Sequence, residues 1–187
     1  MTRWRTGAAL VVAGSIGLAL GSVRLAAQHD VEYSVKAEYL FNFIQFTEWP
    51  AGAFSAADAP FRICIAGSDP FGPLLDRVVR GEKTEAHPLV VDRVDDDGNF
   101  GRCHLVFIGR AETPRAPAIL KSIPTAHVLT VGESSDFLRD GGAIAFAVDG
   151  GRVRFDVNLG APHIKSLRVS SKLLRVARTT WRGPDRP

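Results

Sequence analysis

Short, continuously apolar segments alternate with helical patterns in the middle of the chain, and this alternation constrains the fold most. Four segments have the composition of buried strands, namely 61–66, 88–94, 104–109 and 127–131. Apolar residues recur at helical spacing over 71–79, after the first strand, and a shorter helical pattern around Ile119 precedes the last. We therefore expect an α/β fold with a mainly parallel sheet and covered faces, because each parallel crossover needs its own connection.

The first strand is followed by a turn at 67–70, in which Asp69 is expected to cap a helix that begins at Pro70. Open α/β sheets bind ligands beyond the carboxyl ends of their strands, so the segments 67–69 and 109–111 would line such a crevice. Asp69 would repel an anion, and we interpret the turn as a helix cap rather than a phosphate site.

The last third of the chain departs from the alternating pattern. The segments 143–148 and 153–158 predict two antiparallel strands, because Asp149, Gly150 and Gly151 between them are typical of a hairpin turn. The sheet should therefore end in a C-terminal β-hairpin.

A final helix is predicted after Ser170 and Ser171, both of which can cap it. Its apolar face would consist of Leu173, Leu174, Ala177 and Trp181, and its other face would carry a basic stripe of Lys172, Arg175, Arg178 and Arg182. Such a stripe is either a solvated helix face, or a docking site for an acidic partner or for anionic lipid headgroups.

The segment 31–47 predicts a helix that is apolar around more than half of its circumference. The apolar residues are Val35, Tyr39, Leu40, Phe41, Phe43, Ile44 and Phe46, and the narrow polar strip holds Ser34, Glu38, Asn42 and Gln45. Such a helix must be covered on two sides. One cover is its own sheet, and the other would be a second subunit or a partner.

The first 27 residues have the order of a cleavable signal peptide, which would leave one domain over 28–187. Arg3 and Arg5 precede an apolar block over 8–20, and the small residues Ala26 and Ala27 follow. The block is shorter than the roughly 20 residues that span a bilayer, so an uncleaved anchor is the less favoured alternative. We expect export, with cleavage near Ala27, and a soluble mature protein.

Export would change the charge of the chain and the state of its cysteines. Loss of Arg3, Arg5 and Arg24 lowers the net charge from +3 to about zero, and the compartment argues against nucleic acid as a partner. The only cysteines are Cys64 and Cys103, which are expected to pair under oxidising conditions, the alternative being two buried thiols in neighbouring strands.

Residues that could carry catalysis, a cofactor or a metal do not form a recognisable pattern. The chain has no nucleophile elbow, no H-E-x-x-H and no glycine-rich phosphate loop. Neighbours on a strand, such as Cys103 and His104, point to opposite faces and are poorly placed to share a metal ion. Ser134 and Ser135 fit a cap better than a nucleophile. We expect no enzymatic activity, no cofactor and no metal.

Several motifs, taken together and in order, resemble one known family. They are VKAEYLFNF (35–43), EWP (48–50), ICI (63–65), DPFG (69–72), CHLVFI (103–108), VLTVG (128–132), GGAI (141–144), RFDVN (154–158) and SSKLL (170–174). The set is similar to the YfiR-like family of exported proteins, and the similarity covers residues 31–177.

The resemblance implies a single Rossmann-like α/β domain without a nucleotide-binding fingerprint, often dimeric and located in the periplasm. A member of this family represses a diguanylate cyclase anchored in the inner membrane by binding its periplasmic part, which lowers cyclic di-GMP and biofilm formation. Cys64 and Cys103 look like a cysteine pair of the family that can form a disulfide, whereas a second pair known in the family is absent here.

We therefore expect this protein to be a periplasmic repressor of a membrane-anchored diguanylate cyclase. We also expect the repressor itself to form a homodimer. The alternative is a periplasmic small-molecule binding module that serves a transporter or receptor. The partner-binding residues assigned on the apolar helix and the basic stripe are Tyr39, Phe41, Phe43, Lys172, Arg175 and Arg178.

Overall fold

The computed structural model describes residues 14–95, 98–124 and 126–182. Residues 1–13 of the expected signal peptide lie outside this range, as do Asp96 and Asp97 of the acidic loop. The helices are α1 (Gly14–Gln45), α2 (Pro73–Val79), α3 (Ala116–Ser122) and α4 (Ser171–Val176). Short 3-10 helices are η1 (Ala51–Ala53), η2 (Phe100–Arg102), η3 (Arg110–Arg115) and η4 (Pro162–Ile164).

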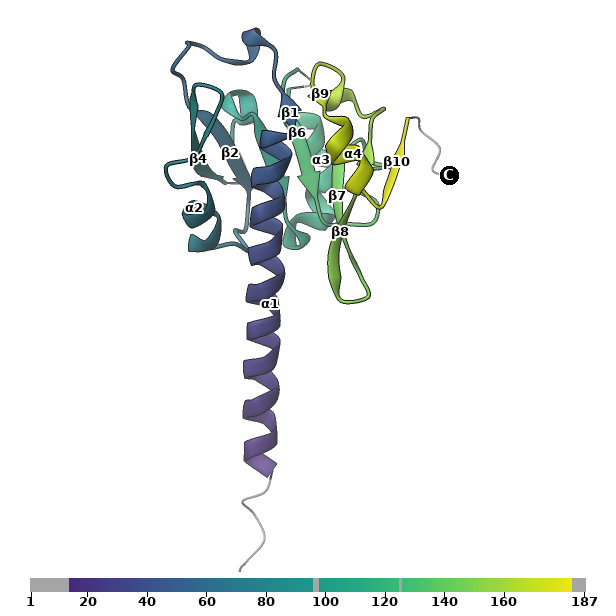
Figure 1. Ribbon diagram of the computed structural model, residues 1–187. Coiled ribbons are helices and arrows are strands. Elements are labelled where there is room, and N and C mark those ends of the chain that lie inside the picture. The colour runs from purple at the N-terminus through teal and green to yellow at the C-terminus, as the bar shows by residue number, and fades with distance from the viewer. Residues whose placement is uncertain (1–13, 96–97, 125, 183–187) are drawn as a thin grey trace, which may run out of the picture.

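The central sheet has eight strands in the order β10-β8-β7-β6-β5-β2-β4-β3 (Figure 1). Its strands are β2 (Phe61–Ala66), β3 (Lys83–Thr84), β4 (His87–Val94), β5 (Leu105–Ile108), β6 (Leu129–Gly132), β7 (Ile144–Asp149), β8 (Arg152–Asn158) and β10 (Thr179–Trp181). Strands β4, β2, β5, β6 and β7 run parallel to their neighbours in this series, and β8 returns antiparallel to β7. The predicted α/β fold with a mainly parallel, Rossmann-like sheet is confirmed.

The two faces of the sheet are covered by different layers. Residues alternate along β2, so that Ile63 and Ile65 pack with α1 and α2, whereas Cys64 belongs to a second apolar cluster on the other face. That second cluster contains α3 residues such as Ile119. The core therefore lies on both sides of continuously apolar strands, as buried parallel strands require.

The predicted hairpin is present, and its turn explains the two glycines. Gly150 has a φ of +55° and Gly151 a φ of +73°, between paired residues Asp149 and Arg152. Two successive left-handed residues are what the tight type I′ turn of a hairpin requires.

Helix α1 is longer than predicted and continues without a break from Gly14 to Gln45. Its first part extends away from the sheet, and its last part crosses the face of the sheet (Figure 1). The following residues form β1 (Thr47–Glu48), which pairs antiparallel with β9 (Arg168–Val169). The sequence analysis did not predict this two-stranded pair, which ties the end of α1 to the C-terminal third.

Helix α2 begins at Pro73, three positions later than predicted. The carboxylate of Asp69 accepts a hydrogen bond from the backbone N–H of Phe71 at 2.8 Å, so it caps a turn and not the helix itself. Gly72, with a φ of +51°, separates that turn from α2.

The predicted final helix is wrong in its second half. Helix α4 ends at Val176, and β10 then pairs parallel with β8, placing Thr180 beside Val157. The free edge of β8 offers unpaired backbone groups, and the β-branched threonines at 179 and 180 favour a strand. The four basic residues therefore do not form one helical stripe.

Candidate functional site

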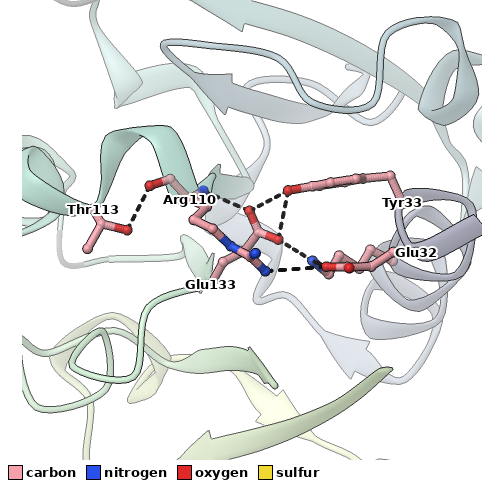
Figure 2. A network of polar contacts seen from close by, with 6 residues as sticks. Glu32, Tyr33, Arg110, Thr113 and Glu133 are labelled. Carbon is pink, nitrogen blue, oxygen red and sulfur yellow. Dashed lines mark hydrogen bonds and ion pairs between the residues drawn. The ribbon is translucent and has the colours of Figure 1, made fainter. Parts of the chain in front are cut away.

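The carboxyl ends of β2, β5 and β6 meet at one edge of the sheet, where ligands bind in many open α/β folds. Glu133 follows β6 directly, Arg110 begins the turn after β5, and α1 passes over the same edge with Glu32, Tyr33 and Lys36. We call these five residues the carboxyl-edge cluster (Figure 2).

The Glu133 carboxylate lies at the centre of this cluster (Figure 2). It accepts hydrogen bonds from the Tyr33 hydroxyl at 3.0 and 3.1 Å and from the backbone N–H of Arg110 at 2.7 Å. It also forms an ion pair with the Lys36 ammonium group. Glu32 completes the cluster, because its carboxylate pairs with Lys36 and, at 3.4 Å, with the Arg110 guanidinium.

The central ion pair is buried, since the side chains of Lys36 and Glu133 are each 1% exposed. Burying two charges is costly unless every remaining donor and acceptor is satisfied, and here both groups have several partners. The Lys36 ammonium also lies 4.4 Å from the centre of the Tyr33 ring, within cation–π range. The cluster therefore fixes α1, at Glu32 to Lys36, to the residue that follows β6.

The cluster also determines the protonation state of Tyr33. Burial, and then the negative charge of Glu133, raises the pKa of Tyr33 well above its usual range. The hydroxyl consequently stays protonated and acts as a hydrogen-bond donor to Glu133 at any physiological pH.

A second carboxylate occupies the end of β2. Glu112, from η3, accepts a hydrogen bond from the backbone N–H of Ser68 at 3.1 Å and pairs with Arg115 at 3.2 Å. Gly67 lies beneath it with a φ of +65°, and a Cβ atom there would be 2.3 Å from the Glu112 Oε1 atom. Only glycine fits this close approach.

Together, Glu112 and Glu133 bond the backbone N–H groups of Ser68 and Arg110, the groups that would meet an anion at this edge. Backbone donors expected to line the crevice at 67–69 and 109–111 are therefore bonded by carboxylates of the chain itself. An open groove of about 850 Å³ remains beside them, and its lining includes Gly67, Ser68, Arg93 and Glu112. Over the described residues, no group of three or more His, Cys, Asp or Glu side chains is placed to hold a metal ion.

A pocket of about 270 Å³ lies beside Glu133, next to β7 and β8. Asp156 and Arg178 line it, and their charges are paired with each other at 2.5 Å. Its volume is below the roughly 300–1,000 Å³ of typical ligand sites. This pocket gives little support to a small-molecule function.

The disulfide between Cys64 and Cys103 is present, as predicted, with 5.9 Å between the two Cα atoms. It joins β2 to the residue that precedes His104 and β5, on the face of the sheet opposite α1. Cys64 and Cys103 are 1% and 6% exposed, so the bond is enclosed in the second apolar cluster.

The aromatic residues assigned to partner contacts on α1 have different positions. Phe43 is fully buried and packs against Phe155 with 4.8 Å between ring centres, so its side chain is not on the surface. This corrects its assignment as a surface contact, because the hairpin covers it. Tyr39 and Phe41 are half-buried and lie at the margin of the same core.

Other apolar residues, on α1 or directly after it, remain exposed to solvent. Val31, Val35 and Phe46 have exposed fractions of 66%, 39% and 37%. The sequence analysis assigned the partner contacts to the aromatic residues and did not single out this strip. Its signal was the position of Val31 and Val35 one helical turn apart, beside the polar residue Ser34.

The basic residues assigned to partner contacts also separate. Lys172 and Arg175 are exposed on α4, whereas Arg178 lies between α4 and β10. Arg178 forms two hydrogen bonds with the buried carboxylate of Asp156, at 2.9 and 2.5 Å. Its hydrogen bonds to Asp156 raise the pKa of the Arg178 guanidinium. The Arg178 side chain is 36% exposed, but its charge is paired with a buried carboxylate and so is less available to a partner than those of Lys172 and Arg175.

His104 connects the loop that contains η1 to the sheet. Its Nδ1 atom accepts a hydrogen bond from the backbone N–H of Arg62 at 3.0 Å, and its Nε2 atom donates to the Ala53 carbonyl at 3.0 Å. Burial lowers the pKa of His104 below its ordinary value, and the charges of His87, Arg62 and His127 act in the same direction. The neutral ring is therefore the form that this loop requires.

Sequence reasoning missed the carboxyl-edge cluster, although one signal was available. Lys36 occurs between Tyr33 and Leu40 at helical spacing, so it is a charged residue on the buried face of α1. A lysine there needs a buried partner. Nothing local identifies that partner as Glu133, which is 97 positions away.

Comparison with protein families matches residues 33–178 to the family described as YfiR/HmsC-like. No curated protein matches the chain. Among the described residues, no helix has both the length and the apolar character needed to cross a membrane.

Proposed function

Because the chain belongs to the YfiR/HmsC-like family, we propose that it is a periplasmic protein that binds and represses a membrane-anchored diguanylate cyclase. Binding would involve the part of the cyclase that lies in the periplasm. In this proposal residues 1–27 are the signal peptide and 28–187 the mature domain, which is not an enzyme. Release of the cyclase would raise cyclic di-GMP, and repression would lower it.

One observation within the fold favours such a role over small-molecule chemistry. Glu112 and Glu133 occupy the carboxyl edge of the sheet, so the usual ligand position holds buried, paired carboxylates. The backbone donors that an anionic solute would meet there are already bonded within the chain. This supports a regulatory binding protein and counts against anion binding at this edge, although the open groove beside Glu112 is a position that the alternative of a solute-binding module could use.

The exposed strip of α1 is the surface that we assign to the cyclase. Val31 and Val35 are exposed apolar residues one helical turn apart, and exposed Phe46 directly follows the last residue of α1. Half-buried Tyr39 and Phe41 border the strip. The buried centre of a protein interface is more apolar than the rest of the surface and is enriched in aromatic residues, which fits this strip and its aromatic border. The alternative is that a second copy of this chain binds the same strip and forms a homodimer.

The experiment replaces Val35 by glutamate and measures both binding and signalling. We expect Val35→Glu to weaken binding of the cyclase's purified periplasmic part at least 10-fold, because a charge would be buried in an apolar contact. Cellular cyclic di-GMP should rise to the level of a deletion strain. Ala118→Glu, an exposed position on α3, is the matched control and should change neither.

Two outcomes would contradict the proposal. One is an unchanged cyclic di-GMP level after deletion of the gene in a strain whose partner cyclase is active. The other is equal loss of binding in Val35→Glu and Ala118→Glu. If Val35→Glu instead changes only the oligomeric state, the strip is a homodimer interface and the cyclase binds elsewhere.

A further inference from the structure

Positive charge is concentrated near the C-terminus of the chain. Between Asp156 and Asp185 there is no acidic residue, but there are six basic ones, namely Lys165, Arg168, Lys172, Arg175, Arg178 and Arg182. The chain has 23 Lys and Arg against 20 Asp and Glu, so outside this stretch acidic residues are in excess. The charges are therefore segregated and not evenly mixed.

Five of these basic residues are exposed and lack an ion-pair partner among the described residues. They are Lys165, Arg168, Lys172, Arg175 and Arg182, which we call the basic surface. Arg178 is excluded because it pairs with Asp156. Glu48 lies opposite Arg168 in the β1–β9 pair and partly offsets its charge. We therefore assign most of the available positive charge to Lys172 and Arg175.

Helix α4 carries two of the five residues of this surface. Lys172, Arg175 and Val176 are at positions i, i+3 and i+4, which places them on one face of the helix. Val176 is 60% exposed, whereas Leu173 on the other face is buried in the core. An exposed aliphatic side chain thus lies next to the two cations on the outer face of α4. Figure 1 shows α4 near β9 and β10, on the side of the sheet where β10 is the edge strand.

We propose that the basic surface binds the anionic phospholipid headgroups of a membrane. Clusters of four to eight Lys and Arg residues are the usual feature of such binding, and an exposed apolar side chain adds contact with the acyl boundary. The biological setting rests on the proposed function, in which the partner is anchored in a membrane. Lipid contact would hold the protein near that partner.

The composition of the surface favours lipid over an acidic protein. The free cations come from the loop after η4, from β9, from α4 and from the end of β10, and their side chains are long and unpaired. A fluid layer of headgroups adapts to any such arrangement, whereas a folded acidic partner needs carboxylates in fixed positions. The near-zero net charge expected after export leaves this surface as the local source of attraction.

The test measures co-sedimentation of the exported protein, purified from the periplasm, with vesicles of phosphatidylglycerol and phosphatidylcholine in a ratio of about 1:2. Each basic residue near an anionic surface contributes roughly a five-fold gain in partitioning, so Lys172→Gln combined with Arg175→Gln should weaken binding about 25-fold. Binding should disappear in high salt and be absent on pure phosphatidylcholine.

The matched control removes two exposed cations elsewhere, through Arg80→Gln and Lys121→Gln. It makes the same change in net charge and should keep vesicle binding within about two-fold. Equal loss in both double variants would overturn the proposal, because binding would then follow total charge. Binding that is the same on phosphatidylcholine alone would overturn it too.

A further measurement separates this proposal from the cyclase hypothesis. The affinity of the Lys172→Gln, Arg175→Gln variant for the cyclase's soluble periplasmic part should equal that of the wild type. Loss of that affinity without any vesicle binding by the wild type would mean that the basic surface recognises an acidic protein, and the lipid proposal would fail. Vesicle binding without any effect of the protein on cyclic di-GMP would support lipid binding and contradict the cyclase role.

Discussion

The carboxyl-edge cluster and the basic surface both contain positive charges, but they use them in opposite ways. Lys36 is 1% exposed and shared between two carboxylates, whereas Lys172 is exposed and has no ion-pair partner among the described residues. In the carboxyl-edge cluster the charges pair with one another and hold α1 on the sheet. On the basic surface the charges remain available to bind another molecule. The difference shows which charges of this domain concern stability and which concern binding.

The largest effect should follow from removing the buried cation. Lys36→Met leaves Glu133 buried without its counterion, which should lower the free energy of unfolding by about 3–5 kcal/mol. Urea denaturation monitored by circular dichroism would measure it. Lys172→Met is the control and should change stability by less than about 0.5 kcal/mol.

Adding Glu133→Gln to Lys36→Met should restore part of the lost stability, because the uncompensated charge is then gone. A loss below about 1 kcal/mol in Lys36→Met would mean that the cluster does not anchor α1, and the contrast with the basic surface would disappear.

The disulfide is a covalent constraint on the opposite face of the sheet and should have the next largest effect. Cys64→Ala with Cys103→Ala opens a link between residues 39 positions apart, and the chain-entropy relation gives a loss of about 4 kcal/mol as an upper value. Reductant should lower the denaturation midpoint of the wild type and leave that of the double variant unchanged. Equal midpoints for wild type with and without reductant would refute this stabilisation.

Arg178 is intermediate between the two regions, since its side chain is 36% exposed but its partner Asp156 is only 5% exposed. Arg178→Gln should lower the free energy of unfolding by about 1–2 kcal/mol, less than Lys36→Met because solvent reaches the guanidinium. Arg175→Gln is its matched control. A loss as small as that of the control would place Arg178 with the basic surface.

His104 makes the interior sensitive to pH in a way that the basic surface is not. Its pKa is lowered in the folded state, so the unfolded chain binds more protons, and stability must fall as pH drops below about 6.5. One such group gives a slope of at most about 1.4 kcal/mol per pH unit. His104→Gln should flatten the dependence of the melting temperature on pH between about 7 and 5. An unchanged dependence would assign the effect to other groups.

The smallest effect on stability is expected for the basic surface itself. Lys172→Gln with Arg175→Gln should shift the free energy of unfolding by no more than about 0.5 kcal/mol, because neither side chain has a described ion pair to lose. Thermal denaturation of the wild type and the variant would show it. A larger loss would indicate that these charges are structural, and would weaken the distinction between the two regions.

The sequence predicted the features that depend on local patterns and missed those that depend on contacts between distant residues. The strands were predictable because the apolar runs, such as 61–66 and 104–109, are local patterns, and the Gly150-Gly151 turn is equally local. The pairing of Lys36 with Glu133 was not, because no local pattern relates residues so distant in the chain. Only the misfit of a lysine on a buried helix face pointed to it.

The end of the chain shows a different limit. Leu173, Leu174 and Ala177 have helical spacing, and a helix to Trp181 satisfied that pattern. The free edge of β8 stabilises a strand at the same residues, and pairing between β8 and β10 is a tertiary contact that local spacing does not encode. The two basic residues on α4 were therefore placed correctly, whereas Arg178 was not.

The carboxylates of Glu112 and Glu133 also have an evolutionary consequence. They accept hydrogen bonds from the backbone N–H groups of Ser68 and Arg110. A phosphate-binding protein of the same architecture would leave such groups free to bind its ligand. On such a scaffold, a regulator and a phosphate-binding protein can differ by a few side chains at one sheet edge while the strands stay the same. Divergence of function can thus proceed by bonding the donors of a site within the chain as well as by building new donors.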